Sequence, residues 1–282
     1  MNSLTTLIHK IFLYSGIFAW DVVLSFGNLL RFKRHVGKVT PEGHPGYGGY
    51  WPEYRPPKEG DSRCSCPALN AMANHGIIAR SGRGIKFTEL TKAIRPTYNF
   101  GSSFCSFVPH YAAFMLNKSY SKDTFDLEEL DLHNGIEHDA SLTRLDAALQ
   151  PKQGEKHAPY IEELLSFATG NNGSLITIKD MSRILGKRRA HSKANNPSYS
   201  LSTFHKVFGS ANSSTMLRIF GGRVDDLRTV LLEERLPEGW ESRVREPYGL
   251  TMLAFNRTVL PVEWGVDESE WADKVKQDNE RA

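Results

Sequence analysis

The sequence predicts a mainly α fold, with a single helical domain preceded by an N-terminal hydrophobic helix. From residue 66 onward apolar residues recur at helical spacing, and few runs alternate between apolar and polar residues. The chain shows no internal repeat and no G-x-G-x-x-G or phosphate-loop motif. Its 282 residues suffice for one domain with a full core plus an appendage. We expect an anchor helix in 1–35, an extended lead-in in 36–62, the domain in 63–265 and a polar tail in 266–282.

Composition and charge exclude several classes of function. With 40% hydrophobic and 24% charged residues, the composition is that of an ordinary globular protein. A net charge of +3 is too small to indicate a nucleic-acid partner, and no basic stripe with interleaved aromatic residues occurs. The short basic run 187–189 is expected to be a solvated helix face. Three cysteines (Cys64, Cys66 and Cys105) are too few for a disulfide framework.

Residues 11–30 form an apolar run about as long as a bilayer-spanning helix. Lys10 precedes the run, and a basic cluster follows it: Arg31, Lys33, Arg34 and Lys38. The length of the run predicts a transmembrane anchor, which we expect in the endoplasmic reticulum, and by the positive-inside rule the charge asymmetry predicts that the domain faces the cytosol. Asp21, near the middle of the run, is costly in lipid, so an interfacial or core helix stays an alternative.

The segments after the anchor divide into an extended lead-in and a series of helices. Glycine, proline and aromatic residues gather in 36–62 and predict extended chain. Segment 201–220 predicts one helix, or two that meet at Gly209. Further helices are expected at 88–94 (ending before Arg95-Pro96), 103–116, 142–149, 160–168 and 178–190.

The stretch around Cys66 carries the clearest chemistry. Pro67 fits the first turn of a helix, where its missing N–H costs nothing, and Gly76 is a plausible stop. Cys66 would then lie at a helix N-terminus, among unpaired N–H groups. That place is expected to lower the thiol pKa and to favour the thiolate, which is the form that binds metal. Taken alone, Cys-Pro would more often be a buried cysteine that opens a core helix.

Three motifs together resemble the fungal haem-thiolate peroxidases, the family of chloroperoxidase and unspecific peroxygenase. They are CPALNAMANHG at 66–76, EHDAS at 137–141 followed by Arg144, and EERLPEGW at 233–240. They stand in the family's order, and the resemblance covers residues 45 to 262. It implies a single haem-peroxidase-like helical domain that binds haem b, here of a membrane-anchored, biosynthetic-cluster type.

The resemblance implies a role for each of the first two motifs. The Cys66 thiolate would be the axial ligand of the haem iron, with Cys64 as the rival ligand. The N–H groups near Ala68 and Leu69 would hydrogen-bond the sulfur. His138 would lie over the distal haem face, with Asp139 orienting it.

The same segment is expected to hold a divalent cation. In the resembled family a magnesium or manganese ion lies beside a haem propionate, and its ligands would here be Glu137, the His138 carbonyl and Ser141. Read without the resemblance, the Glu-His-Asp cluster beside His133 would suggest a zinc hydrolase, but the His-x-x-Glu-His spacing of such a zinc site is missing. A surface acidic turn that caps a helix is the other alternative.

The chain departs from the family where the distal acid–base glutamate belongs. Asn212 stands at that place, and no carboxylate lies between Thr203 and Asp225. An amide can hydrogen-bond peroxide but cannot accept its proton and return it. His205 precedes Asn212 by two helical turns and would share its face if the helix is unbroken.

The expected function is peroxide-driven oxidation of a small organic molecule, such as a secondary metabolite. The expected partners are hydrogen peroxide, that organic substrate and a membrane bound through 11–30, with no nucleic acid. Two alternatives stay open because of Asn212. The first is a haem-bound enzyme of isomerase or dehydratase type, and the second is a haem-binding protein without catalysis.

Overall fold

The computed structural model describes residues 3–281, without the side chains of residues 3–7, 9, 10, 278, 279 and 281. The mainly α prediction is confirmed. The helices are α1 Ser3–Leu29, α2 Pro67–Asn74, α3 Phe87–Tyr98, α4 Ser102–Met115, α5 Ala158–Ser166, α6 Ile178–Asn195, α7 Thr203–Ile219, α8 Val224–Arg228, α9 Met252–Trp264 and α10 Ser269–Arg281. Short turns of 3-10 helix lie at η1 Tyr47–Gly49 and η2 Leu127–Asp131, and a π-helical turn, η3, lies at Thr229–Glu233. Two short strands, β1 Ile85–Lys86 and β2 Thr124–Phe125, pair antiparallel.

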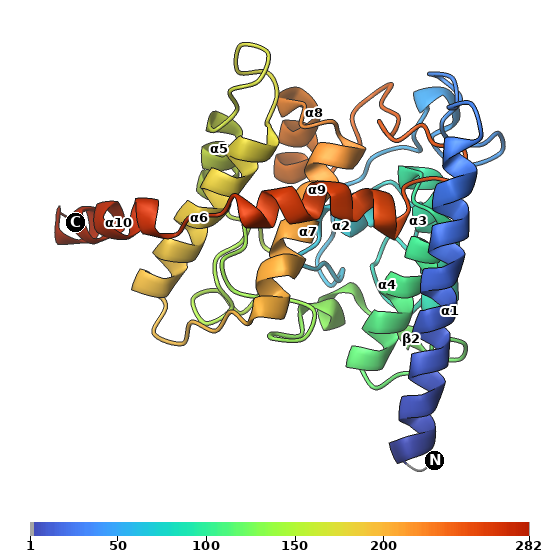
Figure 1. The fold of residues 1–282 in the computed structure, drawn as a ribbon, viewed down its shortest axis with the longest axis horizontal. Helices are drawn as coiled ribbons and strands as arrows, with labels where there is room; N and C mark the ends of the chain where they lie inside the picture. The colour runs from blue at the N-terminus through green and yellow to red at the C-terminus, as the bar shows by residue number, and fades with distance from the viewer. Residues whose placement is uncertain (1–2, 282) are drawn as a thin grey trace.

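The helices surround α2, which carries the cysteine motif. Helix α9 crosses the middle of the molecule and packs against α7 and α6 (Figure 1). Helix α1 runs along one edge, against α4 and α9, and α10 projects from the opposite end. Ala71, Met72 and Ala73 of α2 are fully buried in the main core. This burial fixes the start of α2, and therefore Cys66, within the domain.

Helix α3 continues through Pro96, so the expected end before Arg95-Pro96 is wrong. Pro96 removes one helical N–H donor, but a side-chain hydrogen bond and the burial of the next two residues hold the last turn of the helix. The Thr97 hydroxyl donates to the Ala93 carbonyl at 2.8 Å, and Thr97 and Tyr98 are buried. Asn99 then ends the helix at a φ of 54°, with its amide bonded to the Val244 carbonyl.

The helix expected at 142–149 is absent, and the segment forms turns. Its polar side chains are used for tertiary contacts. Arg144 is fully buried and donates to the Gln153 carbonyl at 2.8 Å. The Asp146 carboxylate accepts hydrogen bonds from the Ala140 N–H and the Ser192 hydroxyl. These contacts hold the chain in a non-helical path that local spacing could not reveal.

One further expectation differs from the structure. The basic run 187–189 is not a solvated face, because Arg188 and Arg189 are buried against Glu163 and Glu263. The polar C-terminal segment forms α10, whose Trp271 packs against α6. Segment 201–220 forms one helix, α7, with no break at Gly209, which is the first of the two predicted alternatives.

Candidate active site

Cys66 is the N-cap residue of α2, directly before Pro67, as the sequence predicts. The N–H groups of Leu69 and Ala68 donate to its sulfur, which confirms the expected contacts. The prediction that the pKa of the Cys66 thiol is lowered is wrong. Burial raises the pKa of the Cys66 thiol and outweighs the two N–H groups and the charge of Arg144. The amides nonetheless point at the atom that would carry a negative charge.

Cys64, the rival ligand, is a structural cysteine in this fold. Its side chain is fully buried, and burial raises the pKa of its thiol well above the usual value. Its Sγ lies 3.6 Å from the Asn70 side-chain oxygen and 3.8 Å from the Cys66 carbonyl. The three cysteines are all free thiols. The geometry therefore favours Cys66 over Cys64 as a ligand.

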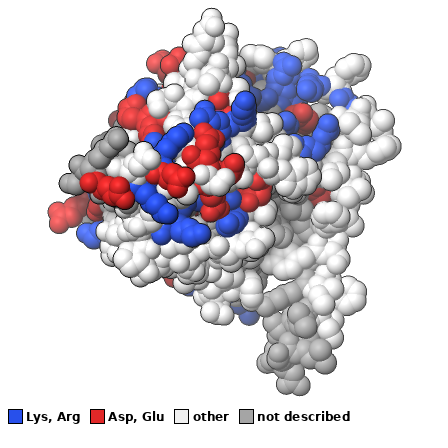
Figure 2. Space-filling model, turned by 60° about the vertical axis from the view of Figure 1, so that its left-hand side comes forward, with Lys and Arg blue, Asp and Glu red and all other residues white. Residues whose placement is uncertain are grey.

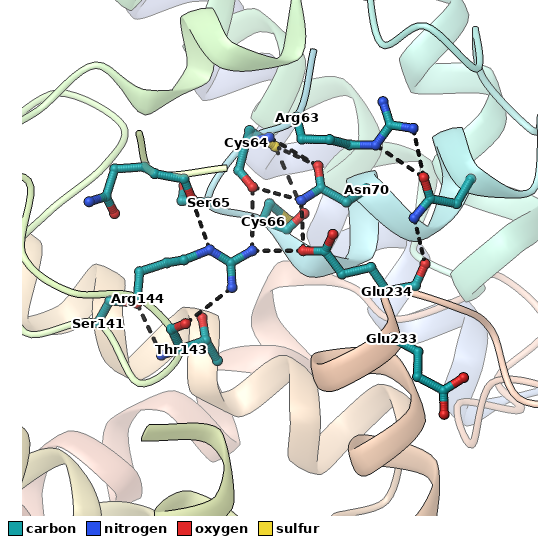
Figure 3. Close-up of polar contacts among 12 residues, drawn as sticks. Arg63, Cys64, Ser65, Cys66, Asn70, Ser141, Thr143, Arg144, Glu233 and Glu234 are labelled. Carbon is teal, nitrogen blue, oxygen red and sulfur yellow. Dashed lines mark hydrogen bonds and ion pairs between the residues drawn. The ribbon is translucent and has the colours of Figure 1, made fainter. Parts of the chain in front are cut away.

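A buried polar network holds residues 63–66, here called the cysteine loop, in place (Figure 3). Asn70 accepts a hydrogen bond from the Cys64 N–H at 3.0 Å and donates to the Cys64 carbonyl at 2.7 Å. The same amide donates to the Glu234 carboxylate at 2.8 Å, and Arg144 donates to that carboxylate at 2.8 Å. Glu234 is nearly fully buried and has a φ of 51°, in the left-handed region. Glu234, from the motif at 233–240, thus holds the motif at 66–76 in place through Asn70.

Arg144→Ala is expected to destabilise the fold by about 3–5 kcal/mol, because it leaves the buried Glu234 carboxylate without its cation. The measurement is the free energy of unfolding of the full-length protein in urea. Arg228→Ala is the matched control, since Arg228 pairs with Glu162 on the surface and its loss costs less than about 1 kcal/mol. Equal losses in the two variants would contradict the structural role of the buried pair.

Two contacts tie the cysteine loop to the Glu137–Asp139 segment. The Ser65 N–H donates to the Asp131 carboxylate at 2.7 Å, just before that segment. After the segment, Arg144 reaches the Cys64 carbonyl at 3.5 Å. Both ends of the segment are therefore fixed to the residues next to Cys66. The first two sequence motifs are therefore joined through residues that flank them.

His138 is held as a neutral imidazole. Its Nδ1 lies 2.7 Å from the Asp139 carbonyl, which can only accept, so Nδ1 carries the hydrogen. Burial lowers the pKa of His138 to about 4. The orienting oxygen thus comes from the main chain of Asp139, whereas its carboxylate accepts from the Ser200 N–H at 2.8 Å. The other carboxylate oxygen, Oδ1, is buried without a hydrogen bond and lies 4.0 Å from His133.

Glu137 lies buried beside His133. Its carboxylate is 2.7 Å from His133 Nδ1, and burial raises its pKa to about 7 in spite of that contact. The Ser141 hydroxyl accepts from the Thr143 N–H at 3.3 Å. Among the side chains that the structure describes, no group of three His, Cys, Asp or Glu residues is placed to hold a metal ion. The expected ion site uses one carboxylate, a carbonyl and a hydroxyl, so it stays a prediction.

Asn212 lies beside His138, on the same face of α7 as His205. The Asn212 Nδ2 lies 3.3 Å from His138 Nε2, and the amide is exposed. The His205 ring is 6.1 Å from the His138 ring between centroids. Ser202 contacts His205 Nδ1 at 2.9 Å, whereas His205 Nε2 is buried without a hydrogen bond.

Two further residues of α7 shape this face, and the sequence analysis did not assign either of them to the site. The Phe208 ring meets His138 edge-on at 6.1 Å. A Cβ at Gly209 would lie 3.0 Å from His138 Cε1, so only glycine lets the ring approach α7 this closely. The spacing 205, 208, 209 and 212 is that of one helix face and was the available signal.

A cysteine at a helix N-terminus with two amides on its sulfur, joined to a buried Glu-His-Asp segment, is an arrangement that suits a thiolate metal ligand. The comparisons agree with a ligand of this class. Residues 52–245 match the family described as "Peroxidase, family 2", and the chain belongs to this family of fungal haem-thiolate peroxidases.

Two relatives show how far the similarity extends. The chain is 26% identical to an aromatic peroxygenase of Cyclocybe aegerita over 209 residues, which is 67% of this chain and 53% of the relative. It is 33% identical to a chloroperoxidase of Leptoxyphium fumago over 136 residues, which is 43% of this chain and 36% of the relative. The chain therefore spans about half or less of these relatives.

Proposed function

We propose that the protein is a haem-thiolate oxidoreductase that uses hydrogen peroxide to oxidise a small organic molecule. The observation that carries the proposal is Cys66 at the start of α2, with the Leu69 and Ala68 N–H groups on its sulfur. A thiolate is stabilised there by hydrogen bonds that do not depend on any other ligand. Family membership supports the same chemistry.

The residues present fit haem b. Cys66 supplies the soft anionic ligand, and the network of Asn70, Arg144 and Glu234 keeps its loop fixed. When bound, a haem with a thiolate ligand supplies the redox chemistry that favours cleavage of the peroxide O–O bond. The cation, magnesium or manganese, would be held by Glu137, the His138 carbonyl and Ser141, all oxygen donors of the kind that hard cations prefer.

His138 and Asn212 would handle peroxide on the distal side. Because Nδ1 of His138 is occupied by the Asp139 carbonyl, its Nε2 is the atom that can accept a proton. The Asn212 amide donates to that nitrogen and can also donate to a peroxide oxygen, but it cannot take up the proton. His138 is therefore the proton acceptor that we assign to the site.

The proposal also covers where the enzyme lies in the cell. The basic residues after the apolar run favour a membrane-associated protein of the endoplasmic reticulum, with its domain in the cytosol. One apolar helix, Ile11–Leu29, is long and apolar enough to associate in this way. Such a setting is consistent with a substrate from secondary metabolism.

The test is haem reconstitution of the full-length protein, followed by peroxide assays. We expect one haem per chain and peroxide-dependent oxidation of a generic aromatic substrate. A haem complex that consumes no peroxide would favour the isomerase or dehydratase alternative, or a binding protein. A chain that takes up no haem would overturn the proposal.

A further inference from the structure

Helix α1 is an amphipathic helix in which Asp21, Ser25 and Asn28 face the domain, whereas most of its large apolar residues face outward. Asp21 is fully buried and accepts hydrogen bonds from the Ser103 hydroxyl and from the N–H groups of Met252 and Leu253, at the start of α9. A carboxylate at that helix N-terminus satisfies two unpaired donors. Asp21 is thus a fixed contact of the fold and not a charge in lipid.

The same face of α1 continues with Ser25 and Asn28, four and seven residues after Asp21. The Ser25 hydroxyl donates to the Thr251 hydroxyl at 2.7 Å. The Asn28 amide donates to the Gly249 carbonyl at 3.0 Å and accepts from the Tyr248 N–H at 2.9 Å. Further toward the N-terminus, Ile17 is buried and Tyr14 meets Phe107 of α4 edge-on at 5.5 Å. The domain therefore holds α1 from Tyr14 to Asn28.

The opposite face of α1 is exposed and apolar. Phe12 is 72% exposed, Val23 68% and Leu29 78%. In Figure 2 the charged side chains gather over the face that carries α6 and α10. The exposed apolar residues between positions 8 and 32 are Ile8, Ile11, Phe12, Phe18, Trp20, Val22, Val23, Phe26, Leu29, Leu30 and Phe32.

Length decides how such a helix can meet a bilayer. A spanning helix needs roughly 20 apolar residues free of the soluble domain. Here the domain holds α1 from Tyr14 onward, so fewer residues than that remain free in the described part of the chain. A spanning position would also pull Asp21 and Asn28 away from α9 and the 248–249 loop.

We infer that α1 lies in the plane of a membrane, with its outer face in one leaflet and the domain attached along its inner face. The partner is a bilayer surface with anionic headgroups, because exposed basic residues stand where the apolar face ends. Arg31 is exposed beside Tyr248, and Lys33, which lies 3.8 Å from the Glu246 carboxylate, has a side chain that is 63% exposed. This inference rests on the proposed membrane association and replaces a spanning anchor by a one-leaflet contact.

The first arm of the test measures binding of the full-length protein to vesicles of phosphatidylcholine with phosphatidylserine by flotation. The wild type should float with the vesicles, and less so at high salt or without phosphatidylserine. Val23→Asp/Phe26→Asp should lower the bound-to-free ratio by more than about tenfold, because two lipid-facing apolar side chains become charged. The matched control, Leu149→Asp/Ile178→Asp, places the same charges at exposed apolar positions away from α1 and should float as the wild type does.

The second arm reports the orientation of α1. Asn2→Cys, just before α1, and Lys38→Cys, after it, are treated with a membrane-impermeant maleimide added outside the vesicles, with the unsubstituted protein as blank. If α1 lies in the plane of the membrane, both of its ends stay on the outer side, so both positions should be labelled to the same extent. Protection of one position until detergent is added would show a spanning helix and overturn the inference.

Two other results would also overturn it. One is a wild-type protein that does not float with the vesicles. The other is a wild-type protein that forms a dimer in solution and does not bind vesicles, with the dimer lost in the Val23→Asp/Phe26→Asp variant. Far-ultraviolet circular dichroism of each variant shows that the domain is folded. Because haem uptake and peroxide assays are independent of flotation, failure of this inference is distinct from failure of the proposed function.

Discussion

Cys66→Ala abolishes thiolate ligation of haem, and Cys64→Ala leaves it largely intact; this is the expected result for the ligand assignment. Cys66 has two N–H groups on its sulfur, whereas Cys64 has one such backbone contact, with Cys66, and its sulfur also lies near the Asn70 oxygen and the Cys66 carbonyl. Oxygen acceptors do not stabilise a thiolate, but N–H donors do. The fully buried Cys64 would also have to leave the core to reach a metal.

The measurement is the absorption spectrum of the ferrous–CO complex, in which a thiolate ligand shifts the Soret band strongly to the red. Cys105→Ala is the matched control, because Cys105 is also buried but lies on α4. The assignment fails if the red-shifted band survives in Cys66→Ala and disappears in Cys64→Ala.

The local part of the fold was predictable because neighbouring residues determine it. Cys66-Pro67 and the apolar spacing of Leu69, Met72 and Ala73 predict a helix that starts after the cysteine, and α2 does so. The same holds for α4, α5 and α6, whose bounds lie within a few residues of the expected ones apart from the longer C-terminal end of α6.

The remainder depends on contacts between distant residues. Arg144 stays out of a helix because its guanidinium binds Glu234, which lies 90 residues away. Asp21 suggested a weak transmembrane helix, but its partners are at the start of α9, 231 and 232 residues later. Patterns within one segment cannot reveal such partners.

The candidate site divides in the same way. The sequence analysis predicts Cys66, His138 and Asn212 as site residues, and the structure brings His138 and Asn212 together. No pattern in the sequence indicates that the Asp139 main chain, and not its carboxylate, fixes the imidazole tautomer of His138. The nearness of His205 to His138 depended on α7 being unbroken at Gly209, which a glycine in a helical pattern leaves open.

Asn212→Glu is expected to raise peroxide-dependent turnover by a factor in the roughly 10²–10⁴ range that general acid–base catalysis provides. A carboxylate at this position can accept the proton of peroxide and return it to the leaving oxygen, which the amide cannot do. Asn212 is exposed and contacts His138, so the longer side chain can reach the same space without repacking the core.

The control for this prediction is Asn212→Gln, which matches glutamate in length and shape but has no titratable oxygen. Turnover should rise only with glutamate, and the rise should be lost below the pKa of the new carboxyl. His138→Ala should lower the wild-type peroxide activity, because its Nε2 is the proton acceptor that the structure offers beside Asn212. Asp139→Asn should lower it less, because the carbonyl that holds His138 Nδ1 is kept. Equal turnover in Asn212→Glu and Asn212→Gln would show that position 212 is not the distal acid–base position, and a slow wild type would then be better explained by a haem-bound enzyme that does not use peroxide.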